Sequence, residues 1–148
     1  GFQPLNPYHW DLGDRQLVEI PVSTMPLVKI PIHFSYVLYL CGFSRSLGLL
    51  YFRLALALCR LTGTQPSLLL HPLDFLGCED VPALAFFPGM NQPSSQKLAT
   101  LAQAIDLLSR QFTVVSMQEH AQRIMSAQRI PHLDPAQRNW ASLPVSPS

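Results

Sequence analysis

"PSLLLHPLDFLG", residues 66–77, decides how the fold is predicted from this sequence. Its apolar start, 67–71, is too short for a helix and is typical of a strand covered on both faces, as in a parallel sheet. Residues 95–110 then repeat apolar side chains at the i, i+3, i+4 spacing of a helix, and 112–116 form a second short apolar run. A strand, a helix and a strand in this order predict a β-α-β unit with a right-handed crossover. We therefore expect an α/β protein.

Further elements are predicted on both sides of this unit. A β-branched run at 15–24 predicts a strand, and 33–42 predicts a short helix that ends at Gly42. A longer helix is expected from about Ser46 to Thr62, and a last helix at about 117–127, which Ser116 and Glu119 would open as a capping box. Residues 127–148 have much Pro and Ser and little periodicity, so we expect a tail that is disordered or loosely docked after a domain that covers 1–126.

Two of these helices have a predicted buried face. On the helix at 46–62 this face carries Leu47, Leu50, Tyr51, Leu54, Leu58 and Leu61. On the helix at 95–110 it carries Leu98, Leu101, Ala102, Ile105 and Leu108, while Lys97, Gln103, Asp106 and Arg110 are expected to face away.

Composition limits the function classes. The chain has 148 residues, 48% of them hydrophobic, which is ample for the core of one domain. Only 13% are charged and the net charge is +1, so we expect no nucleic-acid partner. Three widely spaced cysteines without a CxxC pair argue against a disulfide framework and a zinc knuckle, and they mildly favour a reducing, cytoplasmic compartment. The turn-rich start at Gly1 is typical of the middle of a longer chain.

The most apolar segment is 30–63. Arg45, Arg53 and Arg60 interrupt it, so no uncharged run is long enough to cross a bilayer. Because these arginines are eight and seven residues apart, they share one helical stripe at about 100° per residue. This pattern fits a helix that lies in the plane of a membrane surface. A helix buried on most sides in a globular α/β domain, with one arginine stripe in solvent, gives the same pattern and is the preferred interpretation.

His71 is the last residue of the predicted strand at 67–71. Ligands of open or barrel-shaped α/β sheets bind outside the carboxyl ends of the strands. An imidazole can serve there as an acid or base, since its ordinary pKa lies near neutrality. Asp74, three residues later, could orient or charge it. A structural hydrogen-bonding role for His71 is the alternative that spacing alone leaves open.

An ordered set of segments resembles a known family. The chain is similar, over most of 8–125, to the C-terminal half of bacterial polysaccharide deacetylase-like proteins of the NodB-homology class. The most specific piece is LLLHPLDFLG within 66–77, and the strand that contains EIPVSTMP supports it. The similar segments are LVEIPVSTMP (17–26), PIHFSYVLYL (31–40), LYFRLALALCRLTG (50–63), PSLLLHPLDFLG (66–77), FFPGM (86–90) and FTVVSMQEHA (112–121).

This resemblance implies a distorted (β/α) barrel with parallel strands and covering helices, of which the chain would form the C-terminal part. It implies a hydrolase that removes N-acetyl or O-acetyl groups from carbohydrate with a divalent metal, zinc. His71 looks like the family's general acid in a late "LH" strand motif. Tyr8 and Trp10 lie where the family often has substrate-groove residues, and Asp74 is a third candidate for substrate binding.

The chain departs from the family in its metal site. That site needs an early Asp and a His-x-x-x-His pair, and none of the five histidines form such a pair, so no metal ligand is predicted in this chain. We expect the metal and the general base to belong to the other half of the barrel. Half a barrel exposes strand edges and an apolar face, so self-association is expected.

Two other function classes stay open. One is a module that docks on a membrane surface through 30–63. The other is a carbohydrate-binding module without catalysis, in which Tyr8, Trp10 and the loop 72–92 hold sugar.

Overall fold

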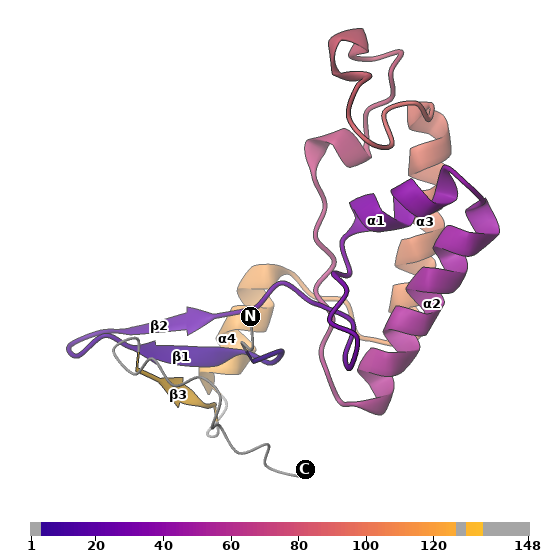
Figure 1. Cartoon of the computed structure of the whole chain (residues 1–148). Coiled ribbons are helices and arrows are strands. Elements are labelled where there is room, and N and C mark those ends of the chain that lie inside the picture. Colours follow the sequence, from indigo (N-terminus) through magenta and orange to yellow (C-terminus); the bar gives the residue numbers. More distant parts are fainter. Residues whose placement is uncertain (1–3, 127–129, 135–148) are drawn as a thin grey trace. The chain divides into compact units, whose positions relative to one another are not determined.

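A computed structural model describes residues 4–126 and 130–134, which belong to two compact units (Figure 1). The first unit contains the residues up to Pro21 and those from Val115 onward, and the second contains Val22–Val114. Each unit is described by itself.

The first unit holds a three-stranded sheet of order β2-β1-β3 and one helix. Strand β1 (Tyr8–Asp11) pairs antiparallel with β2 (Gln16–Glu19) through a tight turn, in which Gly13 has a φ of 83°. The Gly13 N–H donates a hydrogen bond of 3.2 Å to the Asp11 carboxylate. Strand β3 (His132–Leu133) pairs parallel with β1, and helix α4 (Met117–Ser126) precedes it in the chain.

The second unit is built from helices α1 (Phe34–Cys41), α2 (Arg45–Leu61) and α3 (Ser94–Ser109), with short 3-10 turns η1 (Pro72–Asp74) and η2 (Pro82–Leu84). Gly48 lets α2 approach α1 closely, since a Cβ at this position would lie 2.7 Å from the Val37 carbonyl oxygen and would collide with Cys41 Sγ. The core side chains come from all three helices and the segment before α1: Met25, Ile32, Phe34, Val37, Leu38, Cys41, Phe52, Ala55, Leu56, Cys59, Leu101, Ala104 and Leu108.

The predicted β-α-β unit is wrong for the part of the chain that the structure describes. Residues 67–71 are extended, but they form only one parallel bridge, between Leu69 and His33, and 112–116 form no strand. The backbone of 67–71 is bound elsewhere, because Ser67 N–H donates to Ser23 Oγ at 2.6 Å and Leu69 O accepts from Phe34 N–H at 3.3 Å. The described residues thus show a mixed helix and strand fold, and the (β/α) barrel stays a prediction.

The predicted strand at 15–24 is shorter in the structure, where β2 ends at Glu19. The chain then enters a loop closed by a bridge between Thr24 and Pro31. Leu27 and Lys29 in this loop have φ values of 71° and 55°, which a continuous strand does not allow.

The helices α1, α2, α3 and α4 agree with the predicted ranges to within one residue at each end. Their buried faces agree with the prediction in part: Leu101 and Leu108 of α3 are in the core, and Tyr51 and Leu58 of α2 pack against it. The other positions of the predicted buried faces differ. The side of α2 in the core carries Gly48, Phe52, Ala55, Leu56 and Cys59, so Leu54 and Leu61 are 53% and 83% exposed. On α3, Lys97, Thr100 and Ala104 are buried while Leu98 and Ile105 are exposed. Small residues allow helices to pack closely, and this decided the faces over leucine content.

The predicted capping box of α4 is half formed. Ser116 Oγ accepts a hydrogen bond of 3.1 Å from Glu119 N–H, but the Glu119 carboxylate pairs with Arg123 at 2.6 Å. Within the predicted tail, His132 and Leu133 pair with β1 and Leu133 is buried, so these residues are docked rather than disordered. The rest of that tail, 127–129 and 135–148, lies outside the described residues. Over the described ranges, no helix combines the length and apolar character that crossing a bilayer needs.

Candidate functional site

His71 and Asp74 close the short turn η1 by two reciprocal backbone contacts. The Asp74 carboxylate accepts a hydrogen bond of 2.7 Å from His71 N–H, and Asp74 N–H donates one of 2.9 Å to His71 O. Pro72 fits the first position of the turn, because its missing N–H would have no partner there. In the sequence H-P-L-D, the Asp74 carboxylate therefore fixes the backbone of His71.

Ser35, at the start of α1, joins the His71 and Asp74 side chains. Its hydroxyl donates to Asp74 Oδ1 at 2.8 Å, and its Oγ lies 3.2 Å from His71 Nδ1. A carboxylate can only accept hydrogen bonds, so the Ser35 hydroxyl proton points to Asp74, which leaves Ser35 Oγ to accept from His71 Nδ1–H. The three groups thus form a relay from imidazole through hydroxyl to carboxylate, with His71 Nδ1 also 3.7 Å from Asp74 Oδ2.

Burial separates the roles of the two ionisable groups. Asp74 is only 3% exposed, whereas the His71 side chain is 48% exposed. The ring of His33 lies 5.9 Å from that of His71, and Tyr36 stands edge-on to His33 at 6.1 Å. A buried carboxylate therefore supports an imidazole that stays open to a ligand, with two further rings beside it.

Lys97 holds the segment after His71 against α3. Although Lys97 is a cation, it is only 1% exposed, and its Nζ donates to the carbonyl oxygens of Leu73 and Leu76 at 2.9 and 2.6 Å. Desolvation lowers the pKa of Lys97, and the nearby Asp74 charge acts in the opposite direction. The prediction that Lys97 faces solvent is wrong, because these two carbonyl groups offset the cost of its burial.

Glu79 fixes the next part of the same loop to the first residue of α3. Its Oε1 accepts hydrogen bonds from Ser94 N–H at 2.6 Å and from Ser94 Oγ at 2.8 Å. The backbone N–H of Glu79 itself, and then these two contacts, lower the pKa of the Glu79 carboxyl. The carboxylate thereby caps an otherwise unpaired N–H of α3.

Tyr8 and Trp10, the other candidate substrate-binding residues, belong to β1 of the first unit. Tyr8 is buried, and its ring meets Trp10 edge-on at 5.3 Å. Burial, and then the charge of Glu19, raises the pKa of Tyr8. The site around His71 is built from the second unit alone, and a role of Tyr8 and Trp10 in substrate binding stays a prediction.

Sequence reasoning singled out His71 and Asp74, and the structure brings these two together. It did not single out Ser35 or His33. Ser35 is 36 residues from His71 along the chain, and its contact depends on how α1 meets the extended segment 67–71. No local pattern carries that information.

Zinc does not fit the residues of this site. Within 4–126 and 130–134, no group of three His, Cys, Asp or Glu side chains could hold a metal ion. No role as a metal ligand is therefore assigned to His71, Asp74 or their neighbours.

Comparisons with protein-family models, with curated proteins and with solved structures found no match to this chain.

Proposed function

We propose that this chain is the C-terminal portion of a carbohydrate deacetylase-like hydrolase, in which His71 gives a proton to the leaving group. The observation that carries the proposal is the half-exposed His71 imidazole whose Nδ1 faces Ser35 and the buried Asp74 carboxylate. The resemblance of LLLHPLDFLG to the deacetylase-like family supports the same assignment. The substrate class is acetylated carbohydrate.

Hydrolysis of an acetyl group requires a proton donor next to the leaving group, where we place His71. Hydrolysis adds water to the acetyl carbonyl, breaks its bond to the sugar nitrogen or oxygen, and releases acetate. The departing amine or alkoxide needs a proton, which a positioned imidazolium can supply. Since Nδ1 of His71 is engaged with Ser35, Nε2 is the atom that would donate. Asp74 would stabilise the imidazolium, as a buried carboxylate does beside a catalytic histidine.

The test is a His71→Gln substitution in the full-length protein that contains this chain. Glutamine keeps a polar side chain but cannot supply the proton, so we expect turnover of an acetylated oligosaccharide to fall by about 10²- to 10⁴-fold. The matched control is His120→Gln on α4, which removes an imidazole outside the His71 cluster and should leave turnover unchanged. Unaltered turnover in His71→Gln would reject the role of His71. Binding of the oligosaccharide by the wild type without turnover would favour a carbohydrate-binding module.

Peripheral membrane contact is a second candidate, supported by the outer face of α2. Leu47, Leu50, Leu54 and Leu61 are exposed there, together with Arg53 and Arg60. The sequence of α2 contains no acidic residue, so its charge complements an anionic lipid surface.

Co-sedimentation with vesicles tests this second candidate. Vesicles that contain phosphatidylserine should retain the wild-type chain, and Leu50→Ser with Leu54→Ser should reduce retention severalfold. The control, Leu98→Ser, removes an exposed leucine from α3 instead. Equal retention of all variants would reject docking through α2. If the leucine face is covered by a second copy of the chain, the wild type will instead elute as a dimer and the double variant as a monomer.

A further inference from the structure

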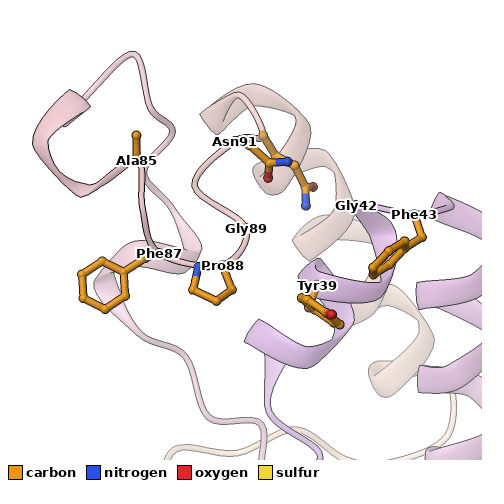
Figure 2. Close-up of a pocket in the computed structure, with 9 residues that line it drawn as sticks. Tyr39, Gly42, Phe43, Ala85, Phe87, Pro88, Gly89 and Asn91 are labelled. Atoms are coloured by element: carbon orange, nitrogen blue, oxygen red, sulfur yellow. The ribbon is translucent and has the colours of Figure 1, made fainter.

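A cavity of about 350 Å³ opens between the carboxyl end of α1 and the loop 85–92, both within the second unit. Figure 2 shows the rings of Tyr39 and Phe43 on the helix side and those of Phe87 and Pro88 on the loop side. The polar side chains of the lining are those of Tyr39, Asn91 and Gln92, and no charged residue is among the described residues that line the cavity. Apolar walls with a few polar groups are typical of sites that bind neutral small molecules or single units of a larger ligand.

Two glycines keep the cavity open. Gly89 has a φ of 82°, so the loop turns there with a conformation that other residues rarely adopt. A Cβ at Gly42 would lie 3.1 Å from the Tyr39 carbonyl oxygen and 3.5 Å from Gln92 Nε2. Both glycines line the cavity, where a side chain would take up its space.

Gln92, which lines the cavity, has a buried acceptor without a partner. The residue is 5% exposed, and its Nε2 donates a hydrogen bond of 2.8 Å to the Leu38 carbonyl oxygen. Among the described residues, no donor reaches its buried Oε1. Buried amide oxygens are nearly always hydrogen-bonded in proteins, so a ligand that donates a hydroxyl or amide proton would satisfy this atom once the Gln92 amide turns it toward the cavity.

The cavity and the His71 site share one face of α1. Ser35, which binds Asp74, and Tyr39, which lines the cavity, are four residues apart, and side chains at this spacing lie on the same side of a helix. Their separation along the helix axis is about 6 Å at 1.5 Å per residue. This is comparable to the length of one sugar unit, so one chain of linked sugars could occupy both places.

We propose that this cavity binds one pyranose ring of an acetylated carbohydrate chain, next to the unit that lies at His71. The proposal rests on the proposed function. The aromatic walls would cover the apolar C–H face of the ring, while a hydroxyl or acetamido N–H donates to Gln92 Oε1. The lack of charge in the lining favours a neutral sugar over a uronic acid or a sugar phosphate.

The experiment is a calorimetric titration of the full chain with a β-1,4-linked N-acetylglucosamine tetrasaccharide. Phe87→Ala and the milder Phe87→Leu both remove an aromatic wall, so each should raise the Kd by about tenfold or more. The control is Phe86→Ala, which removes the neighbouring ring that does not line the cavity and should change the Kd by less than about threefold. Thermal melts of both Phe87 variants show that the fold is retained.

The outcomes separate this proposal from the proposed function. Equal affinity of the wild type and both Phe87 variants would overturn the cavity as a sugar site, and so would the absence of saturable binding to the wild type. Unaltered turnover in His71→Gln, with weakened binding in the Phe87 variants, would reject the proton donor and leave the sugar site supported. Tighter binding of the tetrasaccharide than of the monosaccharide is expected, because only the longer ligand reaches both places.

Discussion

The buried ammonium group of Lys97 donates a hydrogen bond of 2.9 Å to the carbonyl oxygen of Leu73, the residue before Asp74. This contact links the first turn of α3 to the turn that carries His71. The spacing of apolar residues along α3 predicted that Lys97 faces solvent, but Lys97 holds the candidate site in place.

Lys97→Met should destabilise the protein while nearly preserving side-chain volume. The substitution leaves the part-buried carbonyl oxygens of Leu73 and Leu76 without the Lys97 donor, which costs about 0.5–1.5 kcal/mol. Urea unfolding measures the loss, and Arg110→Met, which removes an exposed cation at the end of α3, is the matched control. An unchanged midpoint in Lys97→Met would contradict the role of this contact.

The burial of Lys97 also predicts that the free energy of unfolding depends on pH. Burial lowers the folded-state pKa of Lys97 below its ordinary 10.5, so the unfolded chain binds this proton more tightly than the folded chain does. The contribution of Lys97 to the free energy of unfolding should therefore increase with pH. It is fully present above pH 10.5 and is lost as the pH falls through the lowered pKa. The difference in stability between wild type and Lys97→Met, followed from pH 7 upward, measures it. A difference that stays constant to pH 10.5 would count against the shift.

The lowered pKa of Glu79 predicts that the stability of the protein depends on pH in the acidic range. Its hydrogen bonds hold the folded-state pKa below the ordinary 4.5, so its contribution is present above pH 4.5 and is lost as the pH falls through the lowered pKa. Glu79→Gln should be less stable than the wild type at pH 7, and the two should converge in acid. Glu119→Gln, which removes a carboxylate from α4, serves as the comparison. Curves for Glu79→Gln and wild type that run parallel through this range would disprove the prediction.

Gly48→Ala should destabilise the contact between α1 and α2. The added methyl group meets Cys41 Sγ and the Val37 carbonyl oxygen, and overpacking of this kind costs about 1–3 kcal/mol. Thermal unfolding of Gly48→Ala against Ser46→Ala, an exposed position on the same helix, measures the effect. Since alanine favours a helix over glycine, a more stable Gly48→Ala would show that the two helices do not meet this closely.

Under the proposed function, Ser35→Ala should lower turnover of the acetylated oligosaccharide without abolishing it. The substitution removes the hydroxyl that connects His71 Nδ1 to Asp74, so the imidazole loses its fixed tautomer but keeps its ability to donate a proton. We expect a loss of kcat smaller than that of His71→Gln, and a shift in the pH profile of kcat that a purely structural change would not produce. Restoration by Ser35→Thr, which brings the hydroxyl back, completes the test; failure of threonine to restore the profile would argue against the relay.

The helices of this protein could be predicted from sequence because periodicity and stop signals are local. Gly42 directly follows α1, and Gly63 lies just beyond α2. The strands could be predicted only in part, since β2 lies within the predicted strand at 15–24 but β1 and β3 were not predicted. A short apolar run looks the same whether it enters a sheet or crosses a surface as extended chain, and 67–71 does the latter apart from one bridge.

The site was predictable only in the part that the chain encodes locally. His71 and Asp74 are three residues apart, so the sequence places them together. Ser35, Lys97 and Gln92 come from distant segments, and their roles depend on which helix faces meet. Those faces follow from where small residues such as Gly48 and Ala104 permit close packing, which a count of leucines does not show.

The parallel pairing of β1 with β3 sets an order for folding during synthesis. His9 pairs with His132, so the first sheet strand waits for a partner made more than a hundred residues later. The second unit, Val22–Val114, lies wholly between these two strands and holds its own core. Because domains fold as units once their residues have emerged from the ribosome, the helical unit can pack while the β1–β2 hairpin still lacks its third strand. The nascent chain would then carry an open strand edge from the time β1 is made until β3 is made, and this edge would need protection from pairing with other chains.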